Sequence, residues 1–260
     1  MTNTSPEART QEALNARQFG TTAANYVASA VHAGGADLRQ LVEIARDFGG
    51  ATVIDLGCGG GHVSYALAPI VGSVTAYDLS ADMVAAVAAE ARKRGLTNLS
   101  TRQGSAEALP FEDGAFDAVF CRYTTHHWPD VRKGLREARR VLKAGGKAVF
   151  SDVVAPEVAV YDTFLQTFEM LRDPSHVRDY STAEWVAIAA QAGFAVVGVT
   201  RRRLPLNFND WVGRMRTPPV QVEAIRALFA AVSEPVRQHF EIQPNGDFVI
   251  DQAVFELAPV

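Results

Sequence analysis

A turn of acidic and glycine residues, DLGCGGG from Asp55 to Gly61, is the segment of the chain best suited to hold a ligand. Glycine has no Cβ, so Gly57, Gly59, Gly60 and Gly61 let the backbone bend sharply and approach a bound group closely. Apolar residues before the turn predict a buried strand, and those after it recur at helical spacing. The turn therefore leads into a helix N-terminus, where backbone amides attract polar groups, and the segment predicts a nucleotide-type cofactor site.

The spacing of the glycines limits which cofactor the turn can bind. A dinucleotide fingerprint GxGxxG that starts at Gly57 needs a glycine at position 62, where this chain has His62. Asp78, at the end of the next predicted strand, is placed to hold ribose hydroxyls, which nucleotide cofactors of several kinds carry. Asp78 alone does not separate these cofactors, whereas His62 disfavours a nicotinamide-dependent oxidoreductase.

Later segments support a different family. The acid, one residue and GxGxG of DLGCGGG, with GSAEALPFEDGAFDAVFCRYTTHHWPD and VRKGLREARRVLKAGGKAVF after it, resembles the motifs of class I S-adenosylmethionine-dependent methyltransferases. These enzymes have a Rossmann-like fold, and the resemblance is strongest to the branch related to ubiquinone and menaquinone biosynthesis. It covers roughly residues 50–152. The segments FGTTAANYVAS, RDPSHVRDYSTAEW and DWVGRM resemble uncharacterised bacterial methyltransferases of the same branch.

The resemblance implies a role for each matching residue. The four glycines would line the methionine moiety and ribose of S-adenosylmethionine, Asp55 would orient the amino group and Asp78 would bind the ribose diol. Further implied contacts are Met83 packed on the adenine or in the helix core, Ser105 and Ala106 at the adenine edge, the backbone of Arg122 at the methionine moiety, and Tyr26 in a lid. Ser105 stands where the family has an acid, so we expect adenine recognition to depend more on backbone groups.

Two adjacent histidines are the candidates for catalysis. Methyl transfer from a sulfonium is an in-line displacement, so the protein chiefly aligns the acceptor and excludes water, and no metal is predicted. His126 and His127 lie on the loop after a predicted strand, and either could accept a proton as a general base or pack beside the cofactor. Tyr123, His176 and Tyr180 are further candidates. His62, His126, His127 and Asp152 lack HxxxH spacing, which disfavours a metal site.

The order of strands and helices predicts the fold that must position these residues. A strand before the glycine turn is followed by strands at about 73–78, 98–104, 115–121, 147–154, 194–206 and 248–260. Helices are expected at about 81–95, 131–145, 160–173 and 181–193, with two more in 208–240 separated by Pro218 and Pro219. The alternation predicts an α/β fold, a doubly wound and mostly parallel seven-stranded sheet with an inserted helical cap. We expect one domain over 1–260, with a helical lid at 1–48, a cofactor-binding core at 49–153 and cap insertions at 154–180 and 207–240.

Composition narrows the class of protein and its partners. The 260 residues are 48% hydrophobic and 21% charged with a net charge of -4, which disfavours nucleic acid as a partner. The chain has no apolar run of the ~20 residues that a membrane span needs and no secretory signal, which predicts a cytoplasmic protein. Cys58 and Cys121 have no CxxC spacing, which disfavours a disulfide framework.

The expected partner is a small-molecule or lipid-like methyl acceptor, with a homodimer as one candidate assembly. C- and O-methylation stay open, and a non-catalytic regulator that binds S-adenosylmethionine is the alternative from another class.

Overall fold

The structure is a computed structural model, and it describes residues 10–20 and 34–260, with side chains at 10–18 and 34–260. In the segment expected to form a lid, the described residues form α1 (Gln11–Gly20), α4 (Ala36–Ala45) and a short 3-10 helix, η2 (Arg46–Phe48). Tyr26, the expected lid contact, lies outside the described residues.

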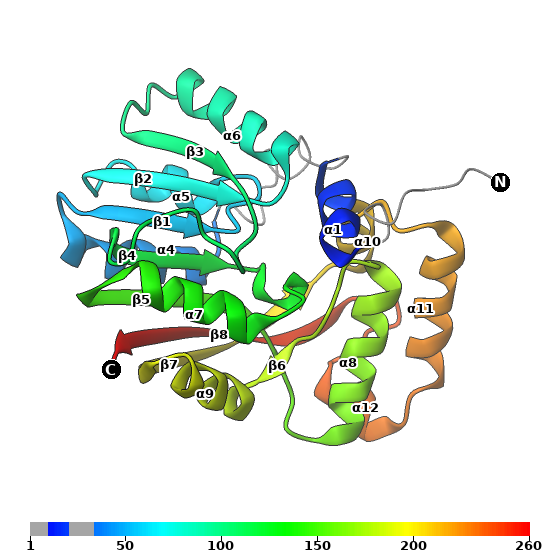
Figure 1. Cartoon of the computed structure of the whole chain (residues 1–260). Coiled ribbons are helices and arrows are strands. Elements are labelled where there is room, and N and C mark those ends of the chain that lie inside the picture. The colour runs from blue at the N-terminus through cyan, green and yellow to red at the C-terminus, as the bar shows by residue number, and fades with distance from the viewer. Residues whose placement is uncertain (1–9, 21–33) are drawn as a thin grey trace.

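A twisted sheet forms the centre of the molecule (Figure 1). Its strands are β1 (Thr52–Leu56), β2 (Ser73–Asp78), β3 (Leu99–Gln103), β4 (Phe116–Arg122), β5 (Leu142–Ala155), β7 (Phe194–Leu206) and β8 (Phe248–Pro259). Their order across the sheet is β3-β2-β1-β4-β5-β8-β7, and β6 (Tyr180–Ser181) adds a short pairing to β5. β1 to β5 run parallel, and β8 is antiparallel to both neighbours. The doubly wound, mostly parallel sheet is confirmed, with β6 as the one described strand that was not predicted.

The strand order places a binding crevice at a defined point. The chain runs outward from β1 through β2 to β3 and then crosses back, so that β4 lies on the other side of β1. In open parallel sheets, ligands bind beyond the carboxyl ends of the strands at such a reversal. The glycine turn after β1 and the histidine loop after β4 both start at this edge.

Alternate residues of the central strands point to opposite faces, and helices cover both. Val53 packs on one face with Leu41 of α4 and Leu67 of α5 (His62–Leu67). Ile54 packs on the other face with Leu135 of α7 (Val131–Val141) and with α9 (Thr182–Gln191). Helix α6 (Ala81–Lys93) follows β2, and the Ser80 side chain caps its N-terminus by accepting from the Met83 amide. A capping box starts α9, with Ser181 and Glu184 bonded reciprocally.

Two helix predictions need correction. The helix expected to reach Gly145 ends at Val141, because Leu142 already pairs with Phe116 in the sheet and a bulge follows. The described residues of 208–240 form three helices instead of two: α10 (Phe208–Arg214), α11 (Pro219–Ala231) and α12 (Glu234–His239). Val232 and Ser233 are extended, so they separate α11 from α12.

The cap has its own apolar core beside the sheet (Figure 1). α8 (Ala159–Arg172) packs with α10, α11 and α12 on the last residues of β7 and the first residues of β8, largely through aromatic rings. Phe164, Leu165 and Phe168 are buried in this cluster and Leu171 is partly buried against it. None of these four residues lines the cavity described below, so this face of α8 is core and not a substrate wall.

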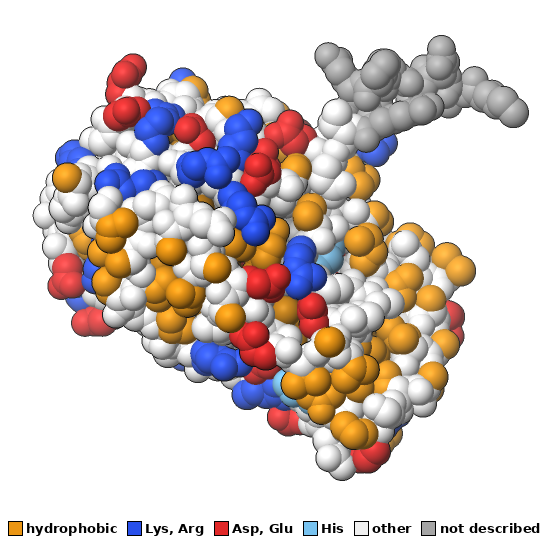
Figure 2. All heavy atoms as spheres, turned by 60° about the horizontal axis from the view of Figure 1, so that its bottom comes forward, with side chains coloured by type: hydrophobic (Ala, Val, Ile, Leu, Met, Phe, Trp, Pro, Cys, Tyr) orange, Lys and Arg blue, Asp and Glu red, His pale blue; other side chains and the backbone are white. Residues whose placement is uncertain are grey.

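Charges of both signs are interspersed with apolar side chains on the face shown in Figure 2. Large exposed apolar side chains at α8 and its N-cap include Val158, Val160 and Met170. Among the described residues, no helix combines the length and apolar character needed to cross a membrane.

Candidate active site

A cavity lies beyond the carboxyl ends of the central parallel strands, and residues of the core, of α1 and of the cap line it. It brings together most of the sequence-predicted site residues: Asp55, Gly57, Gly59, Gly60, Asp78, Met83, Ser105, Ala106, Arg122, His126 and His127. Gly61 is adjacent but is not among the lining residues.

The glycines of the turn have different structural roles. Gly61 precedes α5 with φ 80°, and a Cβ there would lie 2.7 Å from the Tyr65 ring, so this glycine shapes the turn. Gly57 also has positive φ, 72°, and its amide donates to the Tyr77 carbonyl at 2.8 Å. At Gly59, with φ 47°, a Cβ would meet no heavy atom within 4 Å. The backbone at Gly59 therefore borders open space in which a ligand can approach it.

Asp55 lies one residue before the end of β1, and only one of its two carboxylate oxygens accepts a hydrogen bond. Ser64 donates to Asp55 Oδ2 from its amide at 3.0 Å and from its hydroxyl at 2.6 Å. Asp55 Oδ1 is buried without a hydrogen-bond partner. Burial is the main cause that raises the pKa of Asp55 to about 7. An unpartnered carboxylate oxygen at the cavity fits the amino group that the resemblance assigns to it.

Asp78 ends β2 and fixes the turn as well as facing the cavity. Its Oδ2 accepts from the Gly59 amide at 2.8 Å and its Oδ1 from the Ser80 amide at 2.9 Å. Each carboxylate oxygen retains a second lone pair that can accept from a ribose hydroxyl. Asp78 thus faces the cavity while it bonds to the glycine turn, and its ribose contact stays a prediction.

The residues expected on the adenine side also line the cavity. Met83 is fully buried in the core and reaches the cavity, so its contact with adenine stays a prediction. Ser105 and Ala106 lie at the cavity as expected. The Ser105 hydroxyl donates to Oε1 of Glu12, on α1, at 2.8 Å. Sequence reasoning missed Glu12 because no local pattern indicates that α1 packs against the loop after β3.

Arg122, at the end of β4, lines the cavity. Its side chain also forms a buried ion pair, which the sequence did not indicate. Its Nε and Nη2 donate to Asp37 of α4 at 2.6 and 3.1 Å. Both side chains are 6% exposed. Burial alone raises the pKa of Asp37, but the Arg122 guanidinium outweighs burial and lowers it. The expected role of Arg122 was a backbone contact, whereas the structure shows its side chain bonded to Asp37.

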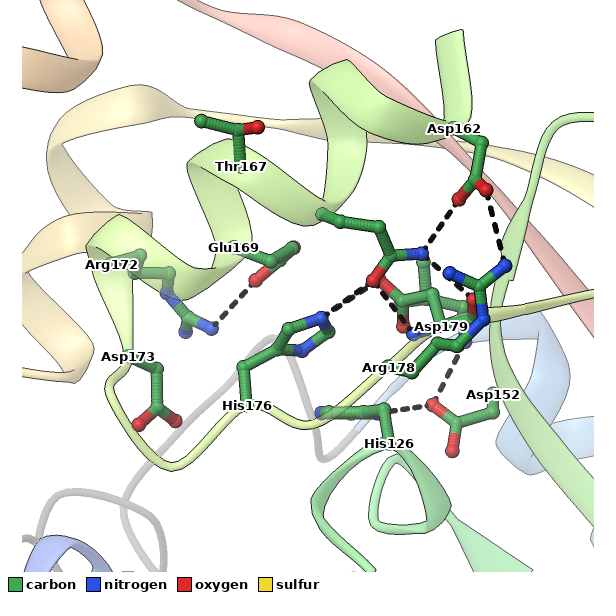
Figure 3. Close-up of polar contacts among 12 residues, drawn as sticks. His126, Asp152, Asp162, Thr167, Glu169, Arg172, Asp173, His176, Arg178 and Asp179 are labelled. Carbon is green, nitrogen blue, oxygen red and sulfur yellow. Dashed lines mark hydrogen bonds and ion pairs between the residues drawn. The ribbon is translucent and has the colours of Figure 1, made fainter. Parts of the chain in front are cut away.

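His126 forms a buried pair with Asp152, a residue of β5 (Figure 3). His126 Nδ1 lies 2.6 Å from Asp152 Oδ1, and the amide and hydroxyl of Thr125 bond to Oδ2 of the same carboxylate. Burial by itself lowers the pKa of His126, but the Asp152 carboxylate outweighs burial and raises it to about 9. The same pairing lowers the pKa of Asp152 against its own burial. One ring nitrogen of His126 is thus held by Asp152, and the residue lines the cavity.

His127 has different surroundings. Its Nδ1 lies 3.2 Å from the Ser175 carbonyl, and its own carbonyl accepts from Asn15 of α1 at 2.8 Å. Burial first, and then the neighbouring His126 charge, lower the pKa of His127 to about 4. The His126 and His127 ring centroids are 4.1 Å apart. His127 is therefore a neutral ring that supports the loop and α1, whereas His126 has the paired carboxylate.

Of the three further candidates for catalysis, one lines the cavity and two do not. Tyr123 lines the cavity with φ 53°, an uncommon conformation for an aromatic residue and one that clusters at functional sites. His176 and Tyr180 are absent from the cavity lining. His176 Nε2 instead contacts Gln166 at 2.9 Å, which makes it part of the cap (Figure 3).

Apolar and charged side chains of the cap and of the adjoining strands line the rest of the cavity. The apolar ones are Trp211 of α10, Val153 of β5, Leu204 and Leu206 of β7, and Ile250 of β8. The charged ones include Glu169 and Arg172, whose Oε2 and Nη1 are 3.6 Å apart, and Asp179, whose buried Oδ2 has no hydrogen-bond partner. Burial raises the pKa of Asp179 well above its ordinary value.

One group among the described residues has metal-ligand character. Potential ligand atoms of His126, Asp152 and Asp179 lie within 4.8 Å of one another. The close hydrogen bond between His126 and Asp152 already occupies one atom of each. The expectation that no metal is needed therefore stays a prediction.

Comparisons with known proteins agree with this geometry. Residues 54–150, which span β1 to β5, match the family described as Methyltransferase domain. The chain is 47% identical to the uncharacterised protein YafE of Escherichia coli over 74% of this chain and 92% of that one. It is 36% identical to the uncharacterised methyltransferase YcgJ of Bacillus subtilis over 89% of this chain and 91% of that one. The crystal structure of YcgJ superposes with a TM-score of 0.82, covering 86% of this chain and 98% of that one at 33% identity.

A demethylmenaquinone methyltransferase of Lactococcus lactis is 35% identical over 48% of this chain and 49% of that one. The match to YcgJ spans nearly the whole of both chains, so it includes the cap as well as the cofactor-binding core. The chain belongs to the class I S-adenosylmethionine-dependent methyltransferase family, as the sequence motifs indicated.

Proposed function

We propose that the chain transfers a methyl group from S-adenosylmethionine to a small acceptor with an apolar body and an ionisable hydroxyl or enol group. The observation that carries this proposal is the cavity itself. Its core end has the open glycine turn, Asp55 and Asp78, and its cap end has the His126–Asp152 pair beside apolar side chains. Donor and acceptor can thus meet in one cavity.

The donor end fits S-adenosylmethionine through three features of this chain. Asp55 Oδ1 is a buried oxygen in need of a donor, which suits the α-ammonium group. Gly59 leaves room for close approach of a ligand to the backbone. Asp78 can accept from the ribose hydroxyls while it holds the turn. When bound, the cofactor supplies a methyl group on a positively charged sulfur, which becomes a neutral thioether as the methyl leaves.

His126 is the proposed proton acceptor. Asp152 holds Nδ1, which directs Nε2 to the acceptor and fixes the ring orientation. With a pKa of about 9 the ring is mostly protonated at neutral pH in the unliganded protein. A bound sulfonium adds positive charge to the cavity, which lowers that pKa and favours the neutral, proton-accepting form. His127 keeps the loop in place, so we assign catalysis to His126 alone.

The side chains of the cap and of the adjoining strands β7 and β8 indicate the acceptor class. Trp211, Leu204 and Ile250 offer an apolar wall for a ring or chain, while His126 and Asp179 can contact a hydroxyl. The similar protein of Lactococcus lactis is named for demethylmenaquinone, whose reduced form has this combination of apolar body and ring hydroxyls. We therefore favour a hydroxylated, quinone-like or lipid-like acceptor, methylated at oxygen or at a ring carbon.

The test is methyl transfer from radiolabelled S-adenosylmethionine to a panel of quinols and to a bacterial lipid extract, with donor binding measured by calorimetry. We expect label in an extractable lipid-soluble product, and its loss in His126→Asn with donor affinity retained. Binding of NAD in place of S-adenosylmethionine contradicts the proposal. Tight donor binding with no labelled product in any fraction favours a non-catalytic regulator.

A further inference from the structure

Helix α1 lies between the strand ends of the core and the cap (Figure 1), and it reaches both sides of the cavity. Glu12, Asn15 and Ala16 of α1 line the cavity. Asn15 Nδ2 donates to the His127 carbonyl at 2.8 Å, and Gln11 Nε2 donates to the Ser175 carbonyl at 2.9 Å. These two bonds anchor α1 to the histidine loop and the cap independently of Glu12.

Glu12 itself points to the loop after β3. The Ser105 hydroxyl donates its only proton to Glu12 Oε1, and its oxygen also accepts from the Glu107 amide at 3.3 Å. The Ser105 carbonyl accepts from the Tyr77 hydroxyl at 3.1 Å. Ser105 is therefore already engaged at both of its oxygens, while the Glu12 carboxylate has a second oxygen to offer.

This end of the cavity has chemistry that suits a purine. Leu79, Met83 and Ala106 contribute apolar surface to the lining, on which a flat aromatic ring can pack. The edge of adenine has an exocyclic amino group with two N–H donors, and a buried donor without an acceptor costs free energy. A carboxylate accepts more strongly than a serine hydroxyl, because the bond is charge-assisted.

We propose that Glu12 of α1 supplies the anionic hydrogen-bond acceptor for the adenine amino group of the methyl donor, a role that Ser105 cannot fill from the loop after β3. Ser105 then acts through Glu12 by fixing its carboxylate. Helix α1 becomes part of the donor site, and the same helix holds the carbonyl of His127. The inference rests on the proposed function, because it assumes that the donor is S-adenosylmethionine.

The test compares two ligands by calorimetry on the full chain: S-adenosylhomocysteine, and S-inosylhomocysteine, in which an oxygen replaces the amino group. The wild type should prefer the adenine ligand. In Glu12→Gln, affinity for S-adenosylhomocysteine should fall about tenfold to a hundredfold, and affinity for the inosine ligand should hold or rise, since an amide can donate to the oxygen. Glu43→Gln, which alters an exposed glutamate on α4, should leave both affinities unchanged.

Rescue makes the test specific. Adding Ser105→Asp to Glu12→Gln places an acid on the loop and should restore the preference for S-adenosylhomocysteine. Equal loss of both ligands in Glu12→Gln, or no loss of either, would overturn the role of Glu12 while leaving S-adenosylmethionine as the donor. If the wild type binds neither ligand, the proposed function fails together with this inference.

Discussion

The buried carboxylate of Asp152 controls the protonation of His126, and Asp152→Asn isolates that effect. The substitution keeps the shape of the side chain and removes its charge. Asp152 is 1% exposed, and its Oδ1 lies 2.6 Å from His126 Nδ1, so little solvent screens the interaction. Without the charge, burial is the main remaining influence, and burial lowers the pKa of His126.

The size of the effect follows from the change in pKa. The pKa of His126 is raised from 6.5 to about 9 in the native structure, a difference on the order of 3 kcal/mol between its two protonation states. We expect the pKa of His126 in Asp152→Asn to fall to 6.5 or below. A base must be neutral to accept a proton, so kcat/KM should rise with pH toward 9 in the wild type. The corresponding rise should move to lower pH in the variant.

The assay is an NMR pH titration of the full chain with labelled histidine, with the His126 signal assigned from His126→Asn. Thr125→Val is the matched control, because it removes a hydroxyl that bonds the same carboxylate but keeps the charge. In this control the pKa of His126 should stay near 9. A wild-type pKa near 6.5, or an unchanged pKa in Asp152→Asn, would refute the assignment of the pair.

Three other substitutions probe the donor end and its supports. Asp78→Ala should weaken S-adenosylhomocysteine binding by ~1.5 to 3 kcal/mol in calorimetry, as expected for a hydrogen-bonded charged group, and unchanged affinity would contradict its ribose role. Gly61→Ala should lower the free energy of unfolding by at least ~1 kcal/mol in urea, because residue 61 has φ 80° and a Cβ would crowd Tyr65; equal stability would show that the turn relaxes. Asp37→Asn leaves the Arg122 guanidinium without its buried carboxylate, so we expect a loss of ~3 to 5 kcal/mol in the same assay, and a loss below ~1 kcal/mol would show that the pair is dispensable.

Local patterns along the chain were enough to predict the central sheet. The β-branched residues before Asp55 and the glycines after it form β1 and the turn, because strand propensity and positive φ depend on local residue types. The helix expected at 181–193 begins at Thr182, next to its N-cap Ser181, because its capping box is also local. Boundaries set by the sheet were less predictable: α7 ends at Val141 because Leu142 meets Phe116, far earlier in the chain.

The candidate site was predicted in its types of residue but not in its pairings. Sequence placed His126 and His127 together as equivalent candidates, and the fold distinguishes them, since Asp152 of β5 contacts only one through a short hydrogen bond. No spacing rule links Asp37 to Arg122.

The amino-acid sequence by itself determined the fold class, the donor-binding turn and the methyltransferase family, because these depend on residue types at fixed local spacing. The tertiary structure decided which histidine is paired with a carboxylate, and it brought the acid of α1 to the loop after β3. Burial and charge depend on which distant elements pack together, and so the pKa values and partners of the site emerge only when the chain is folded.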